Sequence, residues 1–313
     1  MLAMSIILKR IFSSQIWAVF FLVALMIQGC SSQKDQSNSQ ETHKTPKNII
    51  LILGNGLGFD HLRALKQEKS SLTLTKFDVS GVMQPEAYDA LIPDPAAASS
   101  ALATGQLAQN NTIGLNRHGN PSQPLLQMAK NNGYTTGILS TNILNSPQLA
   151  PFYTNHQNFK AYGDHAKALL DAKVDVMIGQ RSPGFKEHKV TRKFEERDYE
   201  IVEDAGKLGR KRDEKILAAV TTKNKKNGEW LQNAWESTFK SLSKSDKGYC
   251  LVISYEEMLA IGSNNNLDQV KQQVGDFDEF VKQIYSYTLN DSKTLVIVTG
   301  NYHKGGFVLN QLN

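Results

Sequence analysis

The side chains best placed for covalent chemistry lie in residues 92–105, which read IPDPAAASSALATG. A nucleophile in this stretch would need a hydroxyl or thiol that a base or a metal ion activates. The residue after Asp94 is Pro95, which offers neither group and also lacks a backbone N–H. Asp94 as N-cap and Pro95 at the first helical position instead suit a helix start. Ser99 and Ser100 follow about one helical turn later and should point elsewhere.

Metal and thiol chemistry have little support elsewhere in the chain. Four histidines are scattered without metal-ligand spacing, and we expect each to be a surface or locally hydrogen-bonded residue: His61, His118, His156 and His165. Cys250 stands in the apolar run 249–253 (YCLVI). This context predicts a small core residue rather than a nucleophile.

The elements that would position these residues are strands and helices that alternate along the sequence. Short apolar runs predict strands at residues 48–53, 134–139, 174–178, 250–253 and 294–299. Helical patterns fall at residues 95–103, 124–130, 166–172, 230–241 and 267–287. Such alternation predicts an α/β fold with a mostly parallel central sheet and helices on both faces. Residues 185–228 are charged and weakly periodic, and we expect a surface excursion there.

The amino-terminal residues predict export and a lipid anchor. Residues 1–29 hold a basic start and an apolar run at 16–27 that is too short to span a bilayer, as in a signal peptide. Cys30 follows Gly29 in a pattern that resembles a bacterial lipobox, which makes Cys30 the expected lipid attachment site. Residues 30–46 are polar and predict a tether. The folded domain then covers residues 47–313.

These features predict a lipid-anchored protein of the bacterial cell envelope, with the outer membrane as the expected location. Whether it faces the periplasm or the exterior is open. The formal net charge of +5 is modest, and acidic residues interrupt the basic clusters at 210–212 and 223–226. We therefore expect no nucleic-acid partner.

Six segments in chain order resemble the alkaline phosphatase family. They are residues 47–58 (KNIILILGNGLG), 93–105 with Ile113 and Gly114 after them, 133–153, 174–179 (VDVMIG), 251–278 in outline with Asp276-Phe277-Asp278 intact, and 294–307 (TLVIVTGNYHKGGF). The resemblance implies a three-layer α/β/α sandwich over about residues 47–308, incomplete at the carboxyl terminus if a late strand is absent. It also implies an enzyme in which two zinc ions and one magnesium ion activate a serine and an arginine clamps the phosphate.

The family's functional positions carry other residue types in this sequence. The nucleophile position is Pro95 and the phosphate-arginine position is Phe159. The metal-ligand positions are Asn55, Asn145, Ser254, Leu259, Ser263, Asn301 and Tyr302, and the histidine position beside Asn145 is Ser146. Glu256 and Glu257 lie near the lost glutamate, but shifting either into its place puts Ile261 or Gly262 where the zinc aspartate belongs. Amides, hydroxyls and apolar groups bind zinc poorly, so we predict no metal cofactor and no catalytic residue.

The resulting hypothesis is a catalytically inactive pseudophosphatase with a binding or scaffolding role. One alternative is an active metal-dependent phosphomonoester hydrolase with atypical ligands, and another is a decayed gene product without function. The lipidated Cys30 would link the chain to a membrane, and a homodimer or protein partner would cover any uncovered sheet edge. The sequence names no small-molecule ligand.

Overall fold

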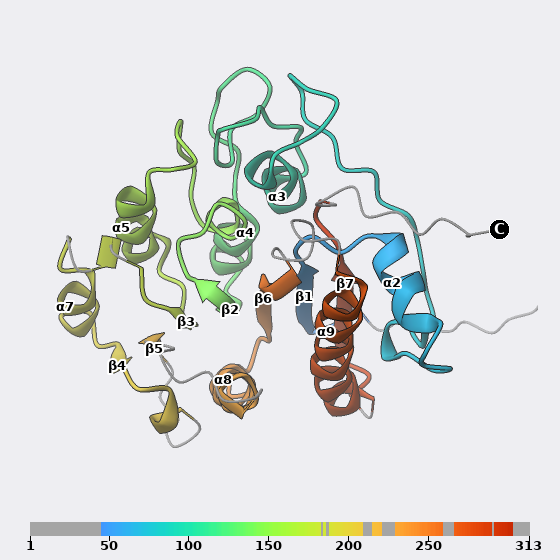
Figure 1. Cartoon of the computed structure of the whole chain (residues 1–313). Helices are drawn as coiled ribbons and strands as arrows, with labels where there is room; N and C mark the ends of the chain where they lie inside the picture. Colours follow the sequence, from blue (N-terminus) through green and yellow to red (C-terminus); the bar gives the residue numbers. More distant parts are fainter. Residues whose placement is uncertain are drawn as a thin grey trace, which may run out of the picture. The chain divides into compact units, whose positions relative to one another are not determined.

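Seven parallel strands form the central sheet of the described structure (Figure 1). The computed structural model describes residues 45–182, 184–185, 188–208, 215–220, 229–258, 266–289 and 291–302. The strands are β1 (Asn48–Gly54), β2 (Thr135–Ile143), β3 (Val176–Gln180), β4 (Glu200–Val202), β5 (Ile216–Val220), β6 (Tyr249–Tyr255) and β7 (Thr294–Thr299). Their spatial order is β4-β5-β3-β2-β6-β1-β7. Every neighbouring pair in this order is parallel.

The inner strands form because their sequences are nearly unbroken apolar runs. β1 reads NIILILG and β6 reads YCLVISY, and every residue of β6 is buried. Such runs are typical of parallel strands that are covered on both faces. The strands predicted at 48–53, 250–253 and 294–299 are confirmed. The strand predicted at 174–178 begins two residues later, at Val176.

Helices cover both faces of the sheet. They are α2 (Phe59–Lys66), α3 (Pro95–Thr104), α4 (Leu125–Asn131), α5 (Tyr162–Ala172), α7 (Val190–Glu195), α8 (Glu229–Leu242) and α9 (Leu267–Thr288). Short 3₁₀ turns occur at Thr73–Thr75 (η2), Ala150–Phe152 (η3) and Ala205–Lys207 (η4). None of the helices in the described ranges is both long and apolar enough to cross a bilayer.

Alternate residues of β1 divide the core between the two faces. Ile50 and Ile52 belong to a cluster with buried residues of α2, α8 and α9. Leu51 and Leu53 belong to a second cluster with residues of α3, α4, α5 and α7. Because successive strand side chains point to opposite faces, one strand packs against both helical layers. The predicted three-layer α/β/α architecture is confirmed (Figure 1).

Residues 185–228 differ from the expected surface excursion. Within this segment β5 pairs with β3 in parallel, and all five of its residues are buried. β4 adds a further strand beside β5. The prediction failed because the charged residues on both sides of ILAAV dominated the composition of the segment, although ILAAV itself is an apolar run of strand length. Two stretches of this segment, β4 and β5, are therefore part of the sheet.

Several acidic residues that the sequence retains have structural roles. Asp278 of α9 is buried, and its carboxylate accepts hydrogen bonds from the backbone N–H groups of Thr73 (3.1 Å) and Leu74 (2.9 Å). Asp175, just before β3, accepts from the N–H of Thr136 at 2.8 Å. These bonds satisfy backbone donors that would otherwise be buried without partners. Both residues fix the positions of elements around the sheet.

Candidate functional site

The carboxyl ends of β1, β2, β6 and β7 meet at one edge of the sheet, where ligands bind in open α/β folds. The segments that follow these strands supply a polar cluster. Its buried members are Asn55, Ser146, Ser254, Glu256 and Asn301. Four of these residues, all except Glu256, are functional positions that the sequence singled out.

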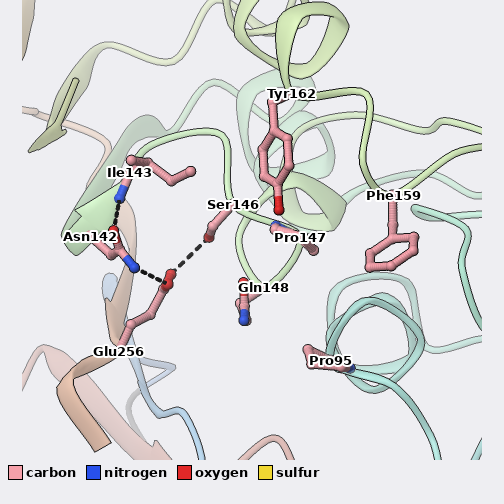
Figure 2. A pocket seen from close by; sticks show the side chains of 9 residues that line it. All are labelled: Pro95, Asn142, Ile143, Ser146, Pro147, Gln148, Phe159, Tyr162 and Glu256. Carbon is pink, nitrogen blue, oxygen red and sulfur yellow. Dashed lines mark hydrogen bonds between the residues drawn. The ribbon is translucent and has the colours of Figure 1, made fainter. Parts of the chain in front are cut away.

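A cavity of about 260 Å³ opens beside this cluster (Figure 2). It is lined by Pro95, Asn142, Ile143, Ser146, Pro147, Gln148, Phe159, Tyr162 and Glu256. Figure 2 shows Glu256 on one side of the cavity and Phe159 and Pro95 on the opposite side. The cavity therefore has one acidic wall and one apolar wall, and no lysine, arginine or histidine is found among the described residues that line it.

The acidic wall is built by hydrogen bonds to Glu256. Its Oε1 atom accepts from the hydroxyls of Ser146 (2.7 Å) and Ser254 (2.9 Å), and its Oε2 atom accepts from the Asn142 amide (3.1 Å). The Glu256 backbone N–H donates to the Thr141 hydroxyl at 2.8 Å. The carboxyl ends of β2 and β6, together with Ser146 after β2, thus fix the carboxyl group in place.

Burial raises the pKa of Glu256 to about 7, against the opposing effect of these three hydrogen bonds. Desolvation disfavours the charged form, while donors aimed at the carboxylate favour it. Glu257 adds a small repulsive contribution in the same direction as burial. No ion pair of Glu256 with a lysine, arginine or histidine occurs among the described residues.

Sequence reasoning missed Glu256 because it tested only shifts of the whole register. In the structure Ser254 occupies the position expected from the resemblance, and the carboxyl group of Glu256, two residues later, lines the cavity. β6 ends at Tyr255, so strand alternation does not fix the direction of the Glu256 side chain. The signal in the sequence was only that Glu256 lies near the lost glutamate position.

Neutral side chains that replace family metal ligands are linked to Glu256 by a chain of hydrogen bonds. The Asn55 amide donates to the Ser254 hydroxyl at 2.9 Å, and Ser254 donates to Glu256. Ser146, at the family's histidine position, donates to the same oxygen of Glu256. Direct hydrogen bonds thus join side chains that the resemblance would have bridged by a metal ion.

Amide oxygens of three asparagines remain without a hydrogen-bond partner in the described structure. They are the Oδ1 atoms of Asn55, Asn145 and Asn301, and all three are buried. The Asn301 amide nitrogen donates to Ser99 (2.8 Å), and that of Asn145 donates to the Tyr162 carbonyl (2.6 Å). Such oxygens suit ordered water or a hard cation better than zinc, which prefers His, Cys and carboxylates.

The apolar wall includes Pro95, and α3 begins at this residue as the sequence predicted. Pro95 begins α3, and Asp94 is its N-cap, with the carboxylate accepting from the Ala97 N–H at 2.7 Å. The second oxygen of Asp94 accepts from the Asn111 N–H. Phe159 packs against the core cluster on the α3 side of the sheet. The ring of Phe159 stands where the resemblance implies an arginine, and the ring of Pro95 stands where it implies a serine.

The other candidate residues take structural positions or lie outside the described residues. Ser100 donates to the Ala96 carbonyl and accepts from the Gly114 N–H, so it does not face the cavity. Tyr302 is buried, and burial raises its pKa to about 12 despite a hydrogen bond with Gln148. The predicted positions Leu259, Ser263 and Cys30 lie outside the described residues.

The remaining histidines and Cys250 are not part of the cavity. Cys250 is buried in β6, and burial raises its thiol pKa to about 11, which confirms a core residue. His165 is fully buried beside His156, with ring centroids 5.3 Å apart. Burial lowers the pKa of His165, followed by repulsion from His156. Within the described ranges, no group of three or more His, Cys, Asp or Glu residues is placed to hold a metal ion.

Comparisons with known proteins identify the class of this fold and site. A sequence model of the alkaline phosphatase family matches residues 46–181. Alkaline phosphatase 4 of Bacillus subtilis (strain 168) is 27% identical over 93% of this chain and 69% of its own length. Alkaline phosphatase 3 of the same organism is 24% identical over 90% of this chain and 65% of its own length.

Solved structures show the same architecture. Alkaline phosphatase from the Antarctic bacterium TAB5 superimposes with a TM-score of 0.73 at 24% identity, covering 84% of this chain and 80% of that one. A cold-active alkaline phosphatase from Shewanella sp. gives 0.70 at 22% identity, covering 82% and 68%. The family model, the curated relatives and the solved structures all support membership of the alkaline phosphatase family. It spans about two thirds of the length of the curated relatives that it matches.

Proposed function

We propose that this chain does not hydrolyse phosphomonoesters and that it uses its cavity at the carboxyl edge of the sheet for binding. The observation that carries this proposal is the apolar wall made by Pro95 and Phe159. Proline has no group that can attack phosphorus, and phenylalanine cannot hold a dianion. A hydroxyl and a guanidinium are missing from the two positions where the family chemistry needs them.

The charge of the cavity supports the same proposal. Phosphoryl transfer depends on cations that stabilise negative charge on the transferred group. In the part of the chain that the structure describes, the lining residues include one carboxyl group and no cationic side chain. A phosphate dianion would therefore meet Glu256 without a compensating positive charge from the lining.

Metal content and phosphate binding test the proposal together. We expect purified, dialysed full chain to retain no stoichiometric zinc, and calorimetry to detect no saturable binding of inorganic phosphate. Bacillus subtilis alkaline phosphatase 4, treated in parallel, controls for metal loss during dialysis. Near-stoichiometric zinc, or phosphate affinity that a chelator abolishes, would overturn the proposal.

A second candidate function is a metal-dependent phosphomonoester hydrolase with atypical ligands. One observation favours it: the carboxyl group of Glu256 and the amide oxygen of Asn55 are oxygen donors of the kind that magnesium accepts. This candidate predicts turnover that requires added magnesium. Titration with magnesium in the same phosphatase assay separates the two functions.

The lipid anchor at Cys30 is part of the proposal. It would hold the chain at a bacterial envelope membrane, expected to be the outer one. We expect wild-type chain expressed in a bacterium with a lipoprotein pathway to fractionate with membranes, and Cys30→Ala to release it. A variant that stays membrane-bound would argue against lipidation at this residue.

A homodimer or protein partner also stays a prediction. β7 is last in the strand order, and its residues Leu295 and Ile297 are 42% and 41% exposed. Apolar side chains on an edge strand favour association. Light scattering of the purified chain measures the oligomeric state, and a monomer at all concentrations would argue against self-association.

A further inference from the structure

The two walls of the cavity have complementary properties that single out one class of ligand. Glu256 is 5% exposed and lines the cavity with its carboxyl group. Neutral donors hold this group, and no cationic partner pairs with it among the described residues. A buried carboxylate without a counter-charge is costly, and a bound cation would remove that cost.

We propose that the cavity binds a small organic cation whose ammonium group contacts Glu256 and whose carbon atoms pack against Phe159 and Pro95. This inference names the ligand class of the proposed binding function and rests on it. The site differs from the anion site implied by the family resemblance, because the sign of its charge is reversed.

The carboxyl group of Glu256 retains capacity for a further donor. An ionised carboxylate has about four lone-pair positions. Three are used, two on Oε1 and one on Oε2. The free position therefore lies on Oε2. An ammonium group placed beside this oxygen, through an N–H or through the C–H groups around a quaternary nitrogen, would be attracted to the carboxylate by its positive charge.

The opposite wall suits the carbon part of such a ligand. The rings of Pro95, Pro147, Phe159 and Tyr162 line this part of the cavity (Figure 2). Aromatic rings also attract cations directly. A volume of about 260 Å³ is slightly below the roughly 300–1,000 Å³ typical of ligand sites, which limits the ligand to a small molecule.

Lys160 is a positively charged residue next to Phe159, on the apolar side of the cavity. Its ammonium nitrogen lies 5.3 Å from the centroid of the Phe159 ring, and the side chain is exposed rather than part of the lining. A bound cation would be repelled by Lys160, weakly because solvent screens exposed charges. The ligand's charge is therefore expected near Glu256, on the far side of the cavity from Lys160.

A matched pair of probes tests the charge requirement on unmodified protein. Choline and its uncharged isostere 3,3-dimethylbutan-1-ol have nearly the same shape, so only charge separates them. We expect calorimetry with the full chain to show saturable choline binding at least about tenfold tighter than binding of the alcohol, which corresponds to about 1.4 kcal/mol. Equal affinity for both probes, or no binding of either, would overturn the inference.

Three variants locate the charge. Glu256→Gln should remove the preference for choline over the alcohol, whereas Glu257→Gln, a neighbour outside the lining, should retain it. Lys160→Gln should strengthen choline binding about twofold to threefold, because it removes a like charge near the cavity. Since Lys160 is exposed, this variant stays informative if Glu256→Gln folds poorly. Choline affinity that Lys160→Gln lowers would contradict the proposed placement.

The outcomes separate failure of this inference from failure of the proposed function. Retained zinc with phosphate turnover would remove the binding function, whatever the probes show. Absence of metal and turnover, together with no discrimination between choline and the alcohol, would leave the inactive protein and refute the ligand class alone. Inorganic phosphate that binds more tightly than choline would also refute the ligand class.

Discussion

Replacing Glu256 by glutamine should change how the stability of the protein depends on pH. The pKa of Glu256 is about 7 in the folded protein and 4.5 for an ordinary glutamate. Between these values the folded state holds a proton that the unfolded state has lost. Stability from this group is therefore fully present below pH 4.5 and is lost as the pH rises through about 7.

The size of the effect follows from the shift. Each pKa unit corresponds to 1.36 kcal/mol, so Glu256 should lower the free energy of unfolding by about 3 kcal/mol between about pH 4.5 and pH 7.5. Glutamine has nearly the same shape and does not titrate. The amide of the substituted glutamine could place its NH₂ group against the Asn142 donor, which would lower the free energy of unfolding. This loss is the same at every pH, so it does not change how the free energy of unfolding varies with pH.

Urea unfolding at several pH values measures this difference, followed by fluorescence of tryptophans that include the buried Trp235. The free energy of unfolding of wild type should fall by about 3 kcal/mol more than that of Glu256→Gln over this range. Glu86→Gln, at an exposed residue, serves as the control and should follow wild type. Parallel pH profiles for wild type and Glu256→Gln would refute the reasoning, because they would show that Glu256 does not titrate in this window.

Three further predictions concern residues around the sheet. Asp94→Ala removes the N-cap of α3 and its bond to Ala97, so urea unfolding should show a loss of about 1–2 kcal/mol. Asp278→Ala leaves the N–H of Thr73 and its neighbour without an acceptor; the loss should be about 2–5 kcal/mol, and Asp278→Asn, which keeps one acceptor, should lose less. Pro95→Ser restores a hydroxyl but no phosphate clamp, and a phosphatase assay should detect no gain of turnover. Turnover in that variant would mean that metal activation survives.

The fold could be predicted from sequence wherever one element has one clear pattern. β1 and β7 are apolar runs bounded by glycine, and α3 has a carboxylate N-cap followed by proline. β5 was not predicted, because its five apolar residues stand in a stretch that was interpreted as a whole from its charged composition. Its burial depends on pairing with β3, which is a tertiary contact.

The sequence analysis identified which family positions carry other residue types. It did not predict that some of these residues surround a cavity with Glu256. The sequence identified Asn55, Ser146 and Ser254 as replaced positions, and hydrogen bonds link them to Glu256, for Asn55 through Ser254. The role of Glu256 was missed because it stands outside the family's own motif. Its place in the cavity depends on the direction of the chain after β6, and spacing alone does not determine that direction.

The most direct test of the account is hydrolysis of p-nitrophenyl phosphate by the purified full chain with zinc and magnesium added. Bacillus subtilis alkaline phosphatase 4 serves as the positive control under the same conditions. The account predicts no turnover above a blank without protein, because Pro95 and Phe159 supply neither nucleophile nor clamp. Saturable turnover that co-purifies with the chain and is abolished by a chelator would contradict it.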